Sequence, residues 1–211
     1  MILKTIDHKI RRAFSESSLQ YDVLTSLHKE IARELAAKNS AKEPQTILDV
    51  GMGTGWLTNR LTNIFPNAKV FGLDFAEGMI KTALGQYEHL RVIQSDARHL
   101  PFKENTFDLI ISNLAYQWIE NLSQAFLDCY RPLNQKGTLA LTLFGYDTCR
   151  ELFTALEQTS EKDTAHGLAL KIRRLPSIKQ LEDSLQRARF KDIHVDYERI
   201  KTRFSDMFAL I

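Results

Sequence analysis

Three glycines at alternate positions follow an apolar segment that contains an acid, in the stretch 47–57, ILDVGMGTGWL. Glycine loses much conformational entropy on folding, so such a cluster indicates a sharp turn or a close approach to a ligand. The spacing is not the dinucleotide fingerprint, because Trp56 stands where its third glycine would be, and no Gly-Lys-Ser or Gly-Lys-Thr follows to form a phosphate-binding loop. A tight turn beside an acid suits a ligand with a cationic amino-acid end, and the alternative is a plain strand-to-helix turn. The residues concerned are Asp49, Gly51, Gly53 and Gly55.

Polar residues also end the later apolar segments. Asp74 ends FGLD, where a carboxylate can accept hydrogen bonds from both hydroxyls of a ribose. Asp96 ends IQSD, where it can accept a hydrogen bond from an adenine amino group, and Asn113 follows FDLIIS, beside the expected reaction centre. Each residue alone could be a turn, helix-cap or loop-cap residue. Their order on successive segment ends favours one shared nucleotide-like ligand.

The segments that must position these residues alternate between strand and helix patterns. Short apolar segments that do not alternate in polarity are typical of buried parallel strands, so the sequence predicts an α/β fold with a doubly wound, mostly parallel sheet. Ligands of such sheets bind at the carboxyl ends of the strands, near the point where strand order reverses. The predicted strands are 46–51, 68–74, 90–96, 106–115, 137–144 and 191–200, and the predicted helices include 21–38, 56–65, 78–87, 121–133 and one that begins with a capping box at Ser177 and Gln180.

Length and composition limit the remaining possibilities. The chain has 211 residues, 44% hydrophobic and 26% charged, with a net charge of +2, which gives no general electrostatic reason to expect nucleic acid as a partner. No apolar segment approaches the roughly 20 residues that cross a bilayer, so we expect no membrane association. Cys129 and Cys149 are expected to be two buried thiols in a reducing cytoplasm, with one disulfide as the alternative. Without CxxC or HExxH spacing, we expect no metal site.

Several segments in succession resemble one enzyme family over nearly the whole chain. The glycine turn resembles that of class I S-adenosylmethionine-dependent methyltransferases, and the other segments narrow the resemblance to the malonyl-[acyl-carrier protein] O-methyltransferases of biotin synthesis. Relatives usually carry a glutamine where His28 follows Leu27 in this chain. The segments that carry the resemblance are FSESSLQYD, ILDVGMGTGWLT, GLDFAEGMI, DARHLPFKENTFDLIISNLAYQWIENLSQAF and TLFGYDTCREL.

The resemblance implies a single Rossmann-like domain over residues 1–211. Within it we expect an N-terminal helical lid at 1–40, a cofactor-binding core at 45–143 and a helical substrate lid at 144–190. Relatives end in a further antiparallel strand, which we expect to be missing here. The implied cofactor is S-adenosylmethionine. Its methionine part would pass Gly51, Gly53 and Gly55, its ribose would bind Asp74, and its adenine would bind Asp96 and Ala97.

The implied reaction is methylation of the free carboxylate of a malonyl thioester. A carboxylate with a pKa near ~4 is already an anion at neutral pH, so no general base is needed. Catalysis then consists of aligning the reactants and excluding water. Arg150 is expected to hold the second carboxylate oxygen, with a surface arginine as the alternative. Tyr21 is expected to close the pocket, with a core tyrosine as the alternative, and Asn113 to lie beside the reacting atoms.

The implied partner is an acidic acyl-carrier protein, and we expect the chain to act as a cytoplasmic monomer. Two basic clusters are candidate docking sites, although charge runs are more often solvated surfaces. Two other functions stay open: methylation of another small molecule, such as a quinone precursor, and a non-catalytic assembly factor with the same fold. The basic clusters are Lys9, Arg11 and Arg12, and Lys171, Arg173 and Arg174.

Overall fold

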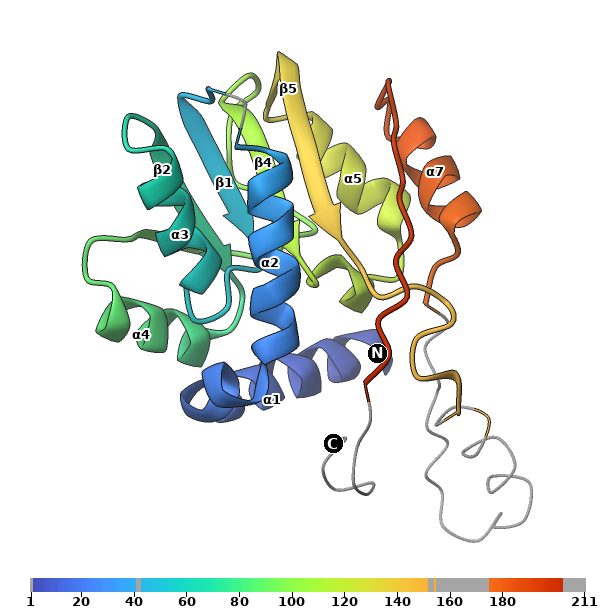
Figure 1. Ribbon diagram of the computed structural model, residues 1–211, viewed down its shortest axis with the longest axis horizontal. Helices are drawn as coiled ribbons and strands as arrows, with labels where there is room; N and C mark the ends of the chain where they lie inside the picture. Colours follow the sequence, from blue (N-terminus) through green and yellow to red (C-terminus); the bar gives the residue numbers. More distant parts are fainter. Residues whose placement is uncertain (1, 41–42, 152–153, 155–174, 203–211) are drawn as a thin grey trace, which may run out of the picture.

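The computed structural model describes residues 2–40, 43–151, 154 and 175–202. Five strands form one sheet in the order β3-β2-β1-β4-β5, and every neighbouring pair is parallel. Strand order reverses between β1 and β4, so the predicted doubly wound α/β fold is confirmed (Figure 1). The strands are β1 (Thr46–Val50), β2 (Lys69–Asp74), β3 (Arg91–Gln94), β4 (Phe107–Asn113) and β5 (Leu133–Thr142).

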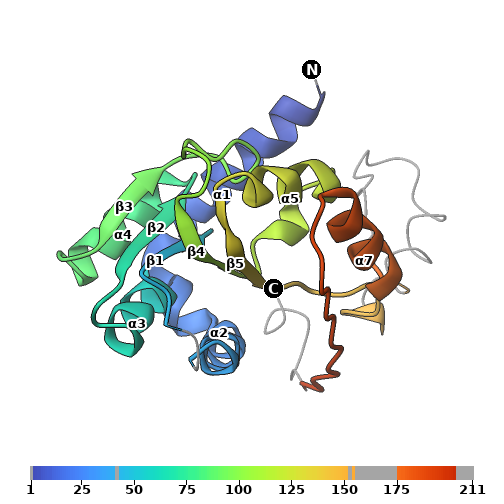
Figure 2. The ribbon, with the colours of Figure 1, turned by 90° about the horizontal axis from the view of Figure 1, so that it is seen from above.

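Helices cover both faces of the sheet, because alternate residues of β1 and β4 point to opposite sides. Ile47 and Leu109 pack with α2 and α3, whereas Leu48 and Ile110 pack with α5. Figure 2 shows α2 and α3 on one side of the sheet and α5 on the other. The helical elements are α1 (Ile2–Leu24), α2 (Ser26–Lys38), α3 (Trp56–Ile64), α4 (Glu77–Gln86), the 3-10 helix η1 (Tyr116–Trp118), α5 (Leu122–Tyr130) and α7 (Ile178–Arg187).

The predicted helix 21–38 is wrong in its extent, because two helices meet at Thr25. This residue leaves helical geometry (φ −111°, ψ 38°), while its hydroxyl donates to the Tyr21 carbonyl at 2.6 Å. The bend places α1 beyond the carboxyl ends of the strands (Figure 1). There α1 packs closely on α4, since a Cβ on Gly78 would lie 2.3 Å from the Ser15 carbonyl oxygen.

The predicted sixth strand, 191–200, is also wrong. These residues pair with no strand among those that the structure describes, and β5 forms the edge of the sheet. The alternating pattern leaves only Ile193 and Val195 partly buried, with the other side chains exposed. The segment therefore offers too little apolar surface to dock against β5. The helix after Ser177 does begin with the predicted capping box to Gln180.

Both cysteines are free thiols, as predicted, but only Cys129 is buried; Cys149 is exposed, so the prediction that both are buried is wrong for it. Within the described ranges, no helix is long and apolar enough to cross a membrane, and no group of three or more potential metal ligands occurs. Lys9, Arg11 and Arg12 lie exposed on α1, whereas the second basic cluster, 171–174, lies outside the described residues.

Candidate functional site

The glycine turn joins β1 to α3 at the carboxyl edge of the sheet. Gly51, Gly53 and Gly55 all have positive φ, at 73°, 54° and 81°. A Cβ on Gly51 would lie 2.3 Å from Ala115 Cβ, and one on Gly55 would lie 2.8 Å from Leu90 Cδ1. A Cβ on Gly53 would meet only the Tyr21 ring among the described residues, with Cε1 at 3.8 Å. Packing therefore requires the outer two glycines, whereas Gly53 borders open space.

That space is a small pocket of about 50 Å³ between the turn and the junction of α1 with α2. Gly55 is not among its lining residues and faces α4 instead. The structure thus brings together most of the predicted residues of the methionine end and the reaction centre, and adds one from α2. They are Tyr21, His28, Asp49, Gly51, Gly53 and Asn113.

Asp49 brings a buried carboxyl group to this pocket. Its Oδ2 accepts a hydrogen bond from the Thr58 hydroxyl at 2.7 Å, but its Oδ1 is buried and has no partner among the described residues. The pKa of Asp49 is raised to about 7, mainly by burial and to a smaller extent by the nearby Asp74 charge, while the hydrogen bond from Thr58 opposes the shift. A cationic ligand would supply the missing partner and favour the carboxylate form.

Asp74, at the end of β2, is 5% exposed and fixes the turn. Its Oδ2 accepts from the Gly53 amide and its Oδ1 from the Ala76 amide, both at 2.9 Å. Burial raises the pKa of Asp74, although these backbone N–H groups oppose the shift. Both carboxylate oxygens are thus already bonded within the protein, and the predicted contact with a ribose stays a prediction.

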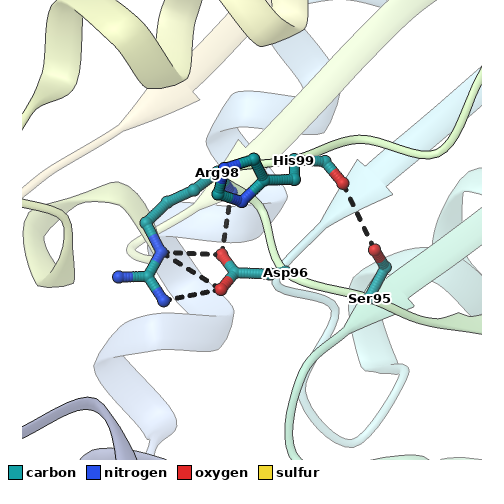
Figure 3. A network of polar contacts seen from close by, with 4 residues as sticks. All are labelled: Ser95, Asp96, Arg98 and His99. Carbon is teal, nitrogen blue, oxygen red and sulfur yellow. Dashed lines mark hydrogen bonds and ion pairs between the residues drawn. The ribbon is translucent and has the colours of Figure 1, made fainter. Parts of the chain in front are cut away.

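Asp96, after β3, is held by a neighbouring arginine (Figure 3). Arg98 Nε donates to Asp96 Oδ1 at 2.9 Å, and Nη2 donates to Oδ2 at 2.6 Å. Burial would raise the pKa of Asp96, but the hydrogen bonds and charge of Arg98 lower it overall. An adenine amino group would have to share these oxygens with Arg98. Ala97 beside it is half-buried.

Asn113 connects three elements. Its Nδ2 donates to the His28 carbonyl of α2 at 3.1 Å, and its Oδ1 accepts from the Thr142 hydroxyl of β5 at 2.8 Å. The next residue, Leu114, has a φ of 52°, and its amide donates to the same hydroxyl at 3.2 Å. The Asn113 amide therefore fixes α2 against the strand ends, and its predicted place beside the reacting atoms stays a prediction.

Arg150 lies apart from the pocket. It is exposed, it begins a helical turn after β5, and it lines a broad groove between β5 and residues 189–202. The pocket beside the glycine turn does not include it among its described lining residues. Only a ligand that extends along the groove could contact both Arg150 and the pocket. Its predicted grip on the acceptor carboxylate stays a prediction.

Sequence reasoning did not assign functions to three residues with buried, unpartnered polar atoms, Arg60 on α3 and two that line the groove. Among the described residues, His28 Nδ1 and Gln117 Oε1 have no hydrogen-bond partner. Both residues line the groove, and His28 also lines the pocket. His28 occurs at a core-like spacing on a helix, so only its difference from the glutamine of relatives could have drawn attention to it.

Comparison with known proteins supports one family. The family described as "Methyltransferase domain" matches residues 48–141. The chain is 33% identical to the malonyl-[acyl-carrier protein] O-methyltransferase of Geobacter sulfurreducens, covering 89% of this chain and 72% of the relative. It is 34% identical to the protein of that name from Xylella fastidiosa, over 97% of this chain and 69% of the relative.

Solved structures share the fold. A Haemonchus contortus phosphoethanolamine N-methyltransferase in complex with S-adenosylmethionine superposes with a TM-score of 0.67 at 22% identity, covering 86% of this chain and 43% of that chain. A Thermotoga maritima S-adenosylmethionine-dependent methyltransferase superposes with a TM-score of 0.64 at 22% identity, covering 89% and 82%.

Proposed function

The chain belongs to the class I S-adenosylmethionine-dependent methyltransferases, and we propose that its acceptor is the free carboxylate of malonyl-acyl-carrier protein in biotin synthesis. The similarity to proteins of that name, over 69% and 72% of their lengths, carries the proposal. We also expect the enzyme to act in the cytoplasm as a monomer. Exposed Lys9, Arg11 and Arg12 on α1 are the described candidates for docking an acidic carrier protein.

The pocket fits the cofactor chemically. When bound, S-adenosylmethionine supplies a methyl group activated by positive sulfur. Asp49 offers its unpartnered Oδ1 to the cationic amino-acid end, and Gly53 leaves room beside the turn. Asp74 holds that turn in shape through the Gly53 amide. Tyr21, brought over Gly53 by α1, excludes water from the pocket.

The acceptor needs no deprotonation. A malonyl carboxylate has a reference pKa near ~4, so it is an anion at neutral pH and can attack directly. The chain must therefore orient one carboxylate oxygen toward the methyl group and shield the pair from solvent. The groove beside β5 and the pocket share His28 in their linings, so we expect a long thioester lying in the groove to reach the reaction centre at this residue.

Mass spectrometry of malonyl-carrier protein, incubated with this protein and S-adenosylmethionine, tests the proposal. The expected result is a mass gain of one methylene group on the malonyl group, with no gain on acetyl-carrier protein. A protein that binds the cofactor but leaves the malonyl group unchanged would have another acceptor. A folded protein that binds no cofactor would favour the assembly-factor function.

A further inference from the structure

His28 lies where the pocket and the groove meet. It lines both spaces, and its ring lies between those of Tyr21 and Phe144, with centroids 6.0 and 5.9 Å away. Its backbone is fixed, because the Asn113 side chain donates to its carbonyl at 3.1 Å. A ligand that passes from the groove toward the glycine turn therefore meets this imidazole.

The imidazole carries an unused hydrogen-bonding atom. Nδ1 is buried and has no partner in the described part of the chain, so its hydration is lost without replacement. Buried polar atoms are nearly always paired, and an exception beside a pocket points to a ligand. Asn113 already donates through Nδ2 and accepts through Oδ1 within the protein, which leaves one N–H of its amide for a ligand.

The charges around the pocket indicate which ligand this is. Asp49 and Asp74 lie on the cofactor side and suit a cation, whereas the acceptor is an anion that needs a donor. Burial lowers the pKa of His28, so its ring is neutral at pH 7 and presents one N–H. A neutral donor can hold one carboxylate oxygen and leave the charge of the other available for attack.

We propose that His28 Nδ1–H donates a hydrogen bond to the acceptor carboxylate and thereby makes the enzyme prefer an acid over a neutral thioester. This inference rests on the proposed function. The second carboxylate oxygen bonds to the methyl carbon as the carbon–sulfur bond breaks, and the electron pair of that bond stays on sulfur. No proton moves, so His28 keeps its own throughout.

Two variants test this role. In His28→Phe, a ring of similar size fits between Tyr21 and Phe144 but donates no hydrogen bond. We expect the KM for malonyl-carrier protein to rise about 10- to 100-fold, the effect of losing a hydrogen bond to a charged group. In His28→Gln an amide N–H restores a donor, and we expect most of the loss to be recovered. Calorimetry should show affinity for S-adenosylhomocysteine within about twofold of the parental value in both.

His89→Phe is the matched control, since His89 is exposed just before the amino end of β3, at the edge away from the site. If the parental enzyme methylates malonyl-carrier protein and His28→Phe has the same KM, the inference about His28 is overturned and the proposed function stands. A parental protein inactive on malonyl-carrier protein would overturn the proposed function. Malonate binding to the product-loaded protein then decides on His28 separately: weaker binding by His28→Phe supports it, and equal or undetectable binding overturns it.

Discussion

The two sides of the site differ in how firmly the protein holds them. At the glycine turn, Asp74 is buried and bonded to two backbone amides, and Gly53 has a backbone conformation that side chains disfavour. Along the groove, β5 is the sheet edge with half-exposed side chains, and Arg150 is exposed to water. A change at the turn should therefore alter folding and binding together, whereas a change at the exposed Arg150 should alter only a solvent-screened contact.

The largest expected effect is that of Gly53→Val, which should abolish cofactor binding. A β-branched residue at a φ of 54° is strained by about 1–3 kcal/mol, and its methyl groups would point into a pocket of only about 50 Å³. Calorimetry with S-adenosylhomocysteine and a thermal unfolding curve would measure both effects. A folded variant with parental affinity would show that ligands do not approach this turn.

The raised pKa of Asp49 predicts how the free energy of unfolding depends on pH. Its pKa is about 7 in the folded protein and near ~3.9 in the unfolded chain, so between these values the folded state binds more protons. The contribution of Asp49 to the free energy of unfolding should be most favourable below about pH 4. It should decrease by on the order of 2–4 kcal/mol as the pH rises to about 7.

Asp49→Asn keeps an acceptor for Thr58 and removes the titration. Urea unfolding across this pH range should therefore give a flatter stability curve for the variant than for the parental protein. Parallel curves would mean that Asp49 is ionised in the folded protein throughout, and that the turn tolerates its charge without a ligand.

Asp74→Ala should have an intermediate effect. It removes the acceptor of the Gly53 and Ala76 amides, so both the free energy of unfolding and the free energy of cofactor binding should fall by about 1–3 kcal/mol. Chemical denaturation and calorimetry measure the two losses independently. Lost stability with unchanged affinity would make Asp74 a purely structural residue and remove its contact with the ribose.

Arg150→Ala should have the smallest effect. An exposed cation contributes about 0.2–1 kcal/mol to a pair, so the KM for malonyl-carrier protein should rise less than about fivefold, with cofactor affinity unchanged. Steady-state kinetics beside His28→Phe would compare the two groove residues directly. A loss of about 100-fold would instead place Arg150 at the reacting carboxylate and reverse the comparison.

The fold and the cofactor side could be predicted because their signals are local. A buried strand, a glycine turn and an acid lie within ten residues of one another, and parallel strands bring their carboxyl ends to one edge, so Asp49, Gly53 and Asn113 converge without further information. The pattern of short apolar segments correctly predicted five strands. The strand prediction was wrong at 191–200, where the alternating segment is mostly exposed and pairs with no described strand.

Features that depend on how particular side chains pack could not be predicted. The sequence pattern predicts that Gly55 faces the ligand, but Leu90 occupies the space beside it. Asp96 reads as a free acceptor, but Arg98 folds back onto both of its oxygens. The sequence pattern predicts that His28 is a core residue of a helix, but after the bend at Thr25 it lines both the pocket and the groove. The corrections at Gly55 and His28 come from packing between elements, which the pattern within one element does not encode, whereas that at Asp96 comes from a side-chain contact two residues away.

The close packing of α1 on α4 has a consequence for the speed of the enzyme. Ligand sites for molecules of this size measure roughly 300–1,000 Å³, and the pocket under α1 measures about 50 Å³. Tyr21 of α1 lines this pocket, so we expect α1 to move away from the turn when the methionine end of the cofactor enters and when the product leaves. Opening and closing of such an element is slow compared with a well-aligned transfer. We expect the residence time of the product, governed by the bend at Thr25, to limit the number of methyl groups transferred per second.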